Sequence, residues 1–222
     1  MEKADVNEAT PLVRRLLTNL LATIKSKDQT AIYAKEVIGW VFTNTPALLT
    51  YGQLGTPLDT CFNACRNAGA DLLHFDQVRI LLTTESPLTL GATMIRDRSI
   101  QLCMAHEGKI ISGMVFTSRQ DVDTLIDQLY WPFHDAEETA ADTMDQMSYV
   151  TLVALKAAII NYLVETARPL PMMLDYEFHQ PLPSLIISQR LYGDASRYDE
   201  IRNENKVVHP LFCPPTGKAL AS

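Results

Sequence analysis

Apolar residues recur every three or four positions along most of the chain, a spacing that predicts helices rather than strands. Thr10 followed by Pro11 is typical of a helix start, because threonine can cap the first turn and proline fits the first helical position. Residues 78–83, VRILLT, are the one place where a short strand competes with a helix. In the first half of the chain, helices are expected over residues 11–27, 28–42, 56–70 and 89–104.

Proline and glycine mark where these helices are expected to end. Thr45 and Pro46 restart the chain after the second helix, and Gly52 and Gly55 break it again before the third. The chain has only 9 glycines against 12 prolines. That balance favours helices broken at definite points over an all-β chain with many tight turns.

The clearest pattern begins at Ser118, where Ser-Arg-Gln-Asp gives the serine-x-x-acid spacing of a helix start. Pro132 is expected to kink the helix that follows, because proline removes a donor and pushes on the preceding turn. A further helix is expected over residues 145–167, and the short join predicts an antiparallel helical hairpin. The apolar stripe of the first of these two helices consists of Val122, Leu125, Ile126, Leu129 and Phe133.

The C-terminal segment 190–212, RLYGDASRYDEIRNENKVVHPLF, is dense in residues that begin or end helices. Gly193 ends one helix, and Asp194 or Ser196 can cap the next. Ile201 anchors that second short helix. Two short helices joined by a Gly-Asp corner are typical of a docking unit rather than a linker.

These patterns predict a mainly α protein, with a helical bundle and a small C-terminal helix-turn-helix unit. Prolines cluster between Arg168 and Pro183, which places the domain boundary there. The helical domain is expected to cover residues 1–170 and the docking unit residues 181–222. A chain of 222 residues is long enough to bury a real core.

Charge and hydropathy exclude some classes of partner. The net charge of −7 argues against a broad nucleic-acid footprint, which needs a clustered basic face. The N-terminus, Met1-Glu-Lys-Ala-Asp, lacks the apolar core of a signal peptide. The longest apolar run, residues 150–164, is interrupted by polar residues and is expected to be too short to span a bilayer. A soluble protein without membrane contact is therefore expected, made in a cytoplasm.

The sequence carries none of the motifs that mark a catalytic or cofactor site. Phosphate-binding glycine loops, HExxH and GxSxG are all missing, and the five histidines are scattered. Cys61 and Cys65 share one helical face, but no further ligand completes a metal site, so buried reduced thiols are expected. No enzyme activity, no catalytic residue, no cofactor and no metal are expected.

Aromatic residues are the stronger candidates for partner binding. Tyr130, Trp131 and Phe133 surround Pro132 and cannot all lie on one narrow stripe. Core filling is the ordinary role of such side chains, and anchoring an interface is the alternative. A second candidate is the extended tail segment His209, Pro210 and Phe212, which either folds back on the short helices or binds another subunit.

The ending LPSLIISQRLYGDASRYDEIRNENKVVHPLFCP resembles the C-terminal signature of the DNA circularisation (DNA circulation) proteins of Mu-like tailed phages. The resemblance extends upstream to about Val115, through FTSRQDVDTLIDQLYWPFHDAEETAAD and ALKAAIINYLVETARPLP. The β-rich N-terminal region of that family is missing. The matching residues are Leu182, Pro183, Leu191, Tyr192, Gly193, Asp194, Ser196, Arg197, Glu200, Ile201, Arg202, Asn203, His209, Pro210 and Phe212.

The same ending is similar to the second half of a LysM module, with a helix, a Tyr-Gly-Asp corner, a second helix, an asparagine and a short final strand. The leading strand of that module, with its usual Gly-Asp-Thr-Leu entry, is expected to be missing. LysM-like units occur in peptidoglycan binding and in phage baseplates. The resemblance implies packing roles for Leu191, Tyr192 and Ile201, and corner-fixing roles for Asp194 and Asn205.

Both resemblances imply a structural protein of the phage tail or baseplate, located in the virion. Its expected partners are hub, tube or spike subunits and further copies of itself. The expected contact residues are Tyr130, Trp131, Phe133, Leu191, Tyr192, Asp194, Arg197, Ile201, Asn205, His209, Pro210 and Phe212. Two alternatives stay open: a protein that binds or circularises DNA ends, which the acidic charge disfavours, and a peptidoglycan-binding module.

Overall fold

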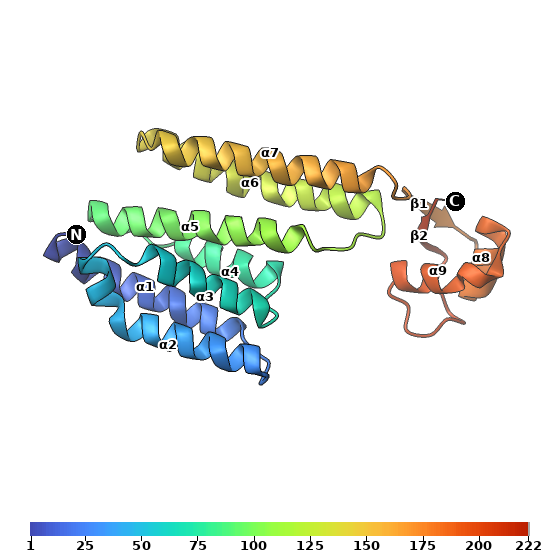
Figure 1. Ribbon diagram of the computed structural model, residues 1–222. Helices are drawn as coiled ribbons and strands as arrows, with labels where there is room; N and C mark the ends of the chain where they lie inside the picture. Colours follow the sequence, from blue (N-terminus) through green and yellow to red (C-terminus); the bar gives the residue numbers. More distant parts are fainter. Residues whose placement is uncertain (222) are drawn as a thin grey trace. The chain divides into compact units, whose positions relative to one another are not determined.

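A computed structural model describes residues 1–221 and is mainly helical, as the sequence predicts (Figure 1). Contacts divide the chain into two compact units, and each contains two separate stretches. The first unit contains Met1–Met114 and Phe133–Ile159. The second contains Val115–Pro132 and the chain from Ile160 onward. The division therefore cuts across the two longest neighbouring helices instead of falling at a single point.

The first unit is a helical bundle. Its core joins α1 to α5, and the largest fully buried side chains there include Phe62, Phe75 and Leu17. Residues 78–83 are helical, within α4, so the helical alternative holds there. The bundle helices are α1 (Lys3–Thr23), α2 (Gln29–Thr50), α3 (Gly55–Asn67), α4 (Leu72–Thr83) and α5 (Leu90–Ile111).

The predicted restart at Thr45 and Pro46 is wrong, because α2 runs through both residues without a break. Proline removes the backbone donor that the carbonyl of Phe42 would otherwise receive. In this bundle Arg14 of α1 supplies a replacement, with its Nε donating to the Phe42 carbonyl at 3.3 Å. The helix continues because a neighbouring helix satisfies the carbonyl that Pro46 leaves free.

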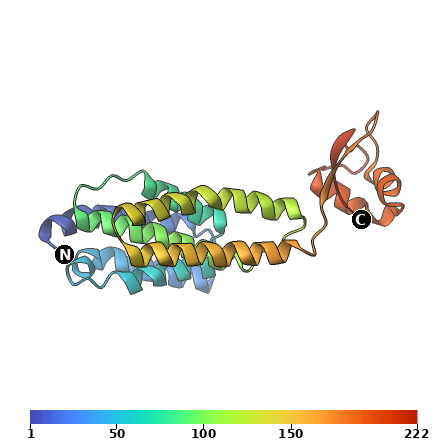
Figure 2. The ribbon, with the colours of Figure 1, turned by 90° about the horizontal axis from the view of Figure 1, so that it is seen from above.

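Two long helices, α6 (Arg119–Asp142) and α7 (Gln146–Ala167), follow the bundle. They run side by side in opposite directions, which confirms the antiparallel hairpin (Figures 1 and 2). The capping box at the start of α6 is also confirmed. The Ser118 amide donates to Asp121 at 3.0 Å, and the Asp121 amide donates to Ser118 Oγ at 3.2 Å. α6 continues through Pro132, and the kink expected there stays a prediction.

The C-terminal part of the second unit has the order strand, helix, helix, strand. Its elements are β1 (Met173–Glu177), α8 (Ser184–Tyr192), the 3₁₀ turn η1 (Ala195–Arg197), α9 (Tyr198–Glu204) and β2 (Thr216–Leu220). β1 and β2 are antiparallel, with Asp175 opposite Lys218 at the centre. We call the segment from β1 to β2 the βααβ unit.

The expectation that a leading strand is missing is therefore wrong. β1 lies within the Pro-rich stretch between Arg168 and Pro183 that the sequence marks as a boundary, and a unit beginning at residue 181 would omit it. The short alternation Leu174-Asp-Tyr176 lacks the usual leading-strand motif, and its partner strand is about forty residues away in the sequence. Local patterns do not report such distant pairing.

The four cysteines are buried and unpaired, as expected for thiols that pack as small apolar groups. Burial raises the pKa of Cys61 to about 12 and that of Cys65 to about 11. Thiols with such high pKa values are protonated at neutral pH and are poor nucleophiles.

A buried ion pair links α4 to α5. Arg79 Nε lies 3.3 Å from Glu107 Oε1, and the Arg79 guanidinium also contacts Asp76. Burial raises the pKa of Glu107 to about 7, although the charge of Arg79 acts in the opposite direction. Because a raised carboxyl pKa means that the folded state holds its proton more tightly than the unfolded state, the stabilisation from this group is lost as pH rises.

We expect the variant Glu107→Gln to gain stability relative to the wild type between pH 5 and pH 8. The glutamine needs no proton, whereas the wild-type carboxyl ionises in a buried site as the pH passes its folded pKa of about 7. The relative gain should be on the order of 2 kcal/mol. Urea unfolding of both proteins at several pH values measures this difference, in which the other titrating groups cancel. A difference that stays constant with pH would contradict the buried position of Glu107.

Candidate docking surfaces

The βααβ unit has its own small core. Its buried side chains come from both strands, both helices and the loops between them: Tyr176, Leu182, Ile187, Ile201, Cys213 and Ala219. Ile201 is completely buried, so its predicted role as the anchor of α9 is confirmed. An isolated two-stranded sheet is marginal in water, and this one is stabilised because α8 and α9 cover one of its faces.

The corner between the two helices forms as the sequence predicts. Gly193 ends α8 in the left-handed conformation, with φ at 70°. Asp194 caps the 3₁₀ turn, because its carboxylate accepts from the Ser196 amide at 2.8 Å and from the Ser196 hydroxyl at 2.8 Å. The backbone hydrogen bond from Ser196 lowers the pKa of Asp194. Of the two proposed capping residues, Asp194 is the one that caps.

Asn205 connects the end of α9 to the second strand. Its side-chain amide donates to the Lys218 carbonyl at 2.8 Å, and its Oδ1 accepts from the Lys218 amide at 2.7 Å. Gly217 makes this approach possible, since a Cβ there would lie 2.2 Å from Asn205 Oδ1 and 2.6 Å from the Tyr176 hydroxyl. The corner-fixing role expected for Asn205 has its structural basis in this double hydrogen bond.

Arg197 lies over the ring of Tyr192, with the guanidinium carbon 3.8 Å from the ring centre. Two parallel hydrogen bonds join Arg197 to Glu200, at 3.0 Å and 2.7 Å. The hydrogen bonding to Glu200 raises the pKa of Arg197. Arg197 is therefore committed to contacts within the βααβ unit. Leu191, beside Tyr192, is 39% exposed.

The loop between α9 and β2 presents apolar side chains on a fixed backbone. Its backbone is held by a bond of 2.7 Å from the Ser184 amide to the Pro210 carbonyl. Phe212 is nevertheless 71% exposed, and its ring lies 5.5 Å from that of His209. The tail is expected either to fold back on the short helices or to bind another subunit. Its backbone folds back on the unit, while its apolar side chains face outward. We call the exposed residues Val208, Leu211 and Phe212 the apolar loop tip.

The aromatic residues around Pro132 divide into two groups. Phe133 is 1% exposed and belongs to the core, as the ordinary interpretation of these residues expects. Tyr130 and Trp131 are 52% and 64% exposed and form an edge-to-face pair with ring centres 5.2 Å apart. Only these two are placed where a partner protein could contact them.

An exposed and mostly apolar surface that the sequence did not indicate lies along α7. Leu152, Ile159 and Leu163 are buried on one side of this helix. The opposite side is exposed at positions separated alternately by three and four residues, the spacing that suits contact with another helix. These positions are Met147, Val150, Ala154, Ala157, Asn161 and Val164, and we call them the α7 stripe.

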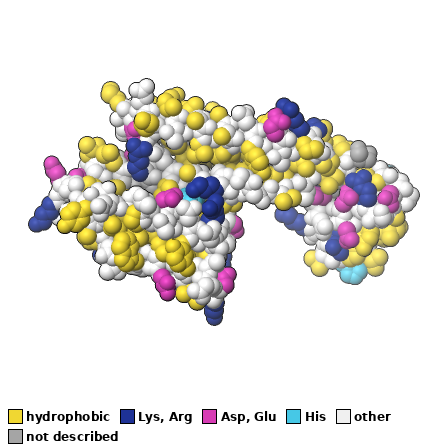
Figure 3. Space-filling model, viewed as in Figure 1, with side chains coloured by type: hydrophobic (Ala, Val, Ile, Leu, Met, Phe, Trp, Pro, Cys, Tyr) yellow, Lys and Arg dark blue, Asp and Glu magenta, His cyan; other side chains and the backbone are white. Residues whose placement is uncertain are grey.

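α7 is the one helix in residues 1–221 whose length and composition would suit a membrane span. Its most apolar stretch has a mean hydropathy of 1.6, and only 22% of that stretch is buried. The sequence predicts that the apolar run of residues 150–164 is too short to span a bilayer, but the helix that contains this run has 22 residues. Figure 3 shows hydrophobic side chains gathered along the α6–α7 pair. Such a surface is unusual for a protein that remains alone in water.

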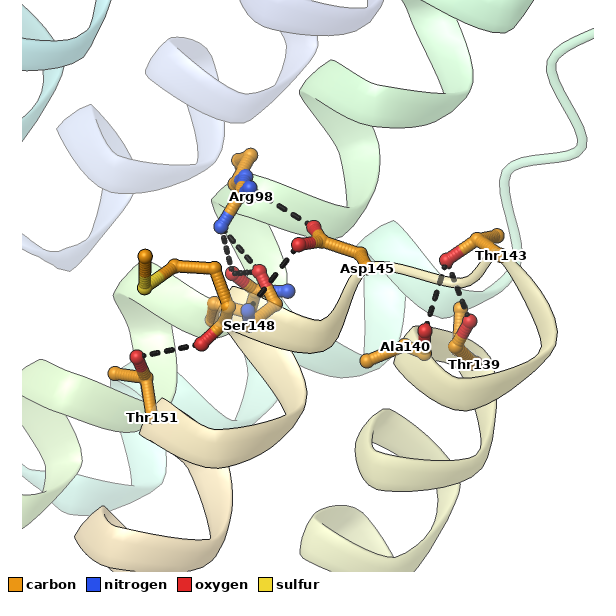
Figure 4. A network of polar contacts seen from close by, with 9 residues as sticks. Arg98, Thr139, Ala140, Thr143, Asp145, Ser148 and Thr151 are labelled. Atoms are coloured by element: carbon orange, nitrogen blue, oxygen red, sulfur yellow. Dashed lines mark hydrogen bonds and ion pairs between the residues drawn. The ribbon is translucent and has the colours of Figure 1, made fainter.

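A cavity of about 350 Å³ lies in the first unit, between α5 and the turn that joins α6 to α7. The Arg98 guanidinium reaches Asp145 at 2.8 Å and also contacts Ser148, while the Thr143 hydroxyl donates to the backbone of Thr139 at 2.8 Å (Figure 4). These polar groups hold the turn against α5, and they are engaged with one another. Within residues 1–221, no group of three or more metal-binding side chains gathers at this cavity or elsewhere.

Comparison with models of known protein families and with curated proteins gives no match for this chain. The candidate docking surfaces are the apolar loop tip, the exposed aromatic pair and the α7 stripe.

We expect Asn205→Ala to destabilise the βααβ unit by about 1–3 kcal/mol, because it leaves the Lys218 amide and carbonyl without their partner. Asn203→Ala is the matched control, since Asn203 is an exposed residue of the same helix. Hydrogen exchange of the full chain should show faster exchange at residues 216–220 in Asn205→Ala and little change in the control. Equal protection in both variants would contradict this role.

Proposed function

We propose that this chain is a structural protein of a phage tail or baseplate, which binds neighbouring subunits through its helical surfaces and its βααβ unit. The observation that carries the proposal is the α7 stripe, a mostly apolar helix face that residues 1–221 leave exposed. Burial of apolar surface stabilises association by roughly 25 cal/mol per Å², so such a face favours assembly. The resemblance of the C-terminal sequence to a family of Mu-like phages supports a tail as the assembly.

The apolar loop tip supports the same function. Val208 and Phe212 are 98% and 71% exposed, while the backbone of their loop is held by hydrogen bonds. A rigid loop with exposed apolar side chains loses little conformational entropy when it binds a partner. Trp131 and Tyr130 offer aromatic anchors of the kind that concentrate binding energy in interfaces.

Peptidoglycan binding is a second candidate, favoured by the presence of β1. With this strand the C-terminal unit has both strands and both helices in the order of a LysM-like module, not only its second half. A cell-wall pull-down with the purified chain tests this candidate. Binding of the tail to the cell wall and attachment within the tail would not exclude each other.

DNA-end binding has less support. In the C-terminal segment, Arg197 is held by Glu200, and Arg202 is paired with Asp199 at 3.1 Å. Charges neutralised in this way contribute little to phosphate binding. Tight DNA binding by the chain at low salt, measured by gel shift, would favour this alternative over the structural one.

We expect the chain to co-purify with tails of the phage that encodes it, including tails that contain no DNA. The double variant Val208→Ser with Phe212→Ser should reduce its incorporation at least severalfold, because each removed side chain contributes apolar contact area. Mass spectrometry of purified tails measures the amount incorporated.

Asn203→Ala serves as the control, since it changes an exposed polar side chain of the same unit. Absence of the wild-type chain from purified tails would contradict the proposal. Recovery of the chain with lipid vesicles in a flotation assay would instead indicate that a membrane covers α7.

A further inference from the structure

Among residues 1–221, β1 belongs to a sheet of two strands, so one of its edges has no partner strand there. In an antiparallel pair, residues alternate between those whose N–H and C=O point at the partner strand and those that point away. The Ala221 amide donates to the Met172 carbonyl at 2.7 Å, and the Phe178 amide donates to the Pro215 carbonyl at 2.7 Å. Even-numbered residues of β1 therefore face β2, and odd-numbered residues direct their backbone groups outward.

The outward backbone groups belong to Met173, Asp175 and Glu177. Only the first of these meets another part of the chain, because the Met173 amide donates to Gln120 Oε1 at 3.0 Å. Among residues 1–221, the backbone N–H and C=O of Asp175 and Glu177 have no hydrogen-bond partner within the chain. Both residues are exposed. These groups form an open strand edge.

On the other side of the sheet, the outward backbone groups at the centre of β2 are hydrogen-bonded within the chain. Lys218 lies opposite Asp175 and directs its own N–H and C=O away from β1. Both groups are bound by the side chain of Asn205, at 2.7 Å and 2.8 Å. The outer edge of β2 is thus closed by a side chain, whereas that of β1 is not. Open edges are sites where another strand can pair.

The side chains beside the open edge define the chemistry of a pairing strand. Asp175 and Glu177 lie on the face of the sheet opposite the buried Tyr176. Neither carboxylate forms an ion pair or a hydrogen bond within residues 1–221. On the other face, Leu174 is 55% exposed. A strand added here would find acidic neighbours on one face and an apolar neighbour on the other.

We propose that the outer edge of β1 binds an extended segment of a partner protein in which basic and apolar residues alternate. Its backbone would pair with Asp175 and Glu177, its Lys or Arg side chains would lie beside their carboxylates, and its apolar residues would contact Leu174. Such strand addition takes affinity from main-chain hydrogen bonds and specificity from alternate side chains. The inference does not rest on the tail proposal, because it follows from the geometry of β1.

A second copy of the chain is the wrong occupant on grounds of charge. Two β1 strands paired antiparallel about their centres would place Asp175 opposite Asp175, and like charges directly opposite each other are destabilising. The acidic residues thus discourage pairing of β1 with itself while favouring a basic segment. The expected partner of this edge is therefore a different protein.

The probe for this surface is a peptide of alternating sequence, acetyl-Thr-Lys-Val-Lys-Val-Lys-Thr-amide, added to the full-length, ¹⁵N-labelled chain. We expect the amide resonances of residues 173–177 to shift, with a Kd below about 1 mM. A peptide with glutamate in place of lysine should bind at least tenfold more weakly. So should a lysine peptide whose alternate amides are N-methylated, because it cannot donate hydrogen bonds to the edge.

Two variants distinguish the contribution of the residue 175 backbone N–H to binding from that of its carboxylate. Asp175→Ala removes the carboxylate and keeps the outward N–H, so binding should weaken about two- to fivefold, and added salt should reduce the difference. Asp175→Pro also removes the N–H, and proline is tolerated on edge strands where that group faces solvent. Its binding should weaken at least tenfold relative to wild type, with resonances outside β1 unchanged.

The proposal is overturned if the lysine peptide causes no shift at β1 at millimolar concentration, or if its shifts lie elsewhere in the chain. It is also overturned if the N-methylated peptide binds as well as its parent. This result does not depend on folding of any variant. A wild-type chain that forms dimers through β1, detected by sedimentation and by protection of Asp175, would assign the edge to a second copy instead.

Discussion

The pairing of β1 with β2 is the interaction on which the C-terminal unit depends. It joins two segments separated by the whole of α8 and α9, and it gives those helices a face to cover. A sheet with two strands has two outer edges, and each needs hydrogen-bond partners or water. Asn205 supplies the partners for β2, and Gly217 leaves the space that this side chain requires. On the outer edge of β1, Gln120 binds the Met173 amide, and no side chain of residues 1–221 binds the outward backbone groups of Asp175 and Glu177.

The α7 stripe is likewise a surface that residues 1–221 leave uncovered, in this case on a helix. One side of α7 packs as an ordinary core helix, while the opposite side is exposed and carries mostly apolar residues, separated alternately by three and four positions. When another surface covers an open strand edge or an exposed apolar stripe, the free energy of the system falls. Together with the apolar loop tip, these surfaces support the proposed role in assembly. The high pKa values of the buried thiols Cys61 and Cys65 agree with a packing role for these residues.

Most local features of the fold were predictable from the sequence, but the helix start expected at Thr10 and Pro11 is wrong, because α1 begins at Lys3 and runs through Pro11. The capping box at Ser118, the helix end at Gly193 and the cap at Asp194 depend on residues that are close in the chain, so their patterns are informative. Features that depend on distant residues were not predictable. α2 continues past Pro46 because Arg14 of another helix replaces the lost donor, and β1 exists because it pairs with a strand about forty residues later. The exposed side of α7 was missed for a related reason. An apolar stripe in a sequence does not indicate whether it faces the core, and the position of its neighbours decides this.

The central claim is that these exposed surfaces are covered by other proteins, and a cryo-EM map of an intact tail that contains the chain tests it most directly. The account predicts density of neighbouring subunits against the α7 stripe and the apolar loop tip. A map in which both surfaces face solvent, or in which the chain stands outside the particle, would contradict it.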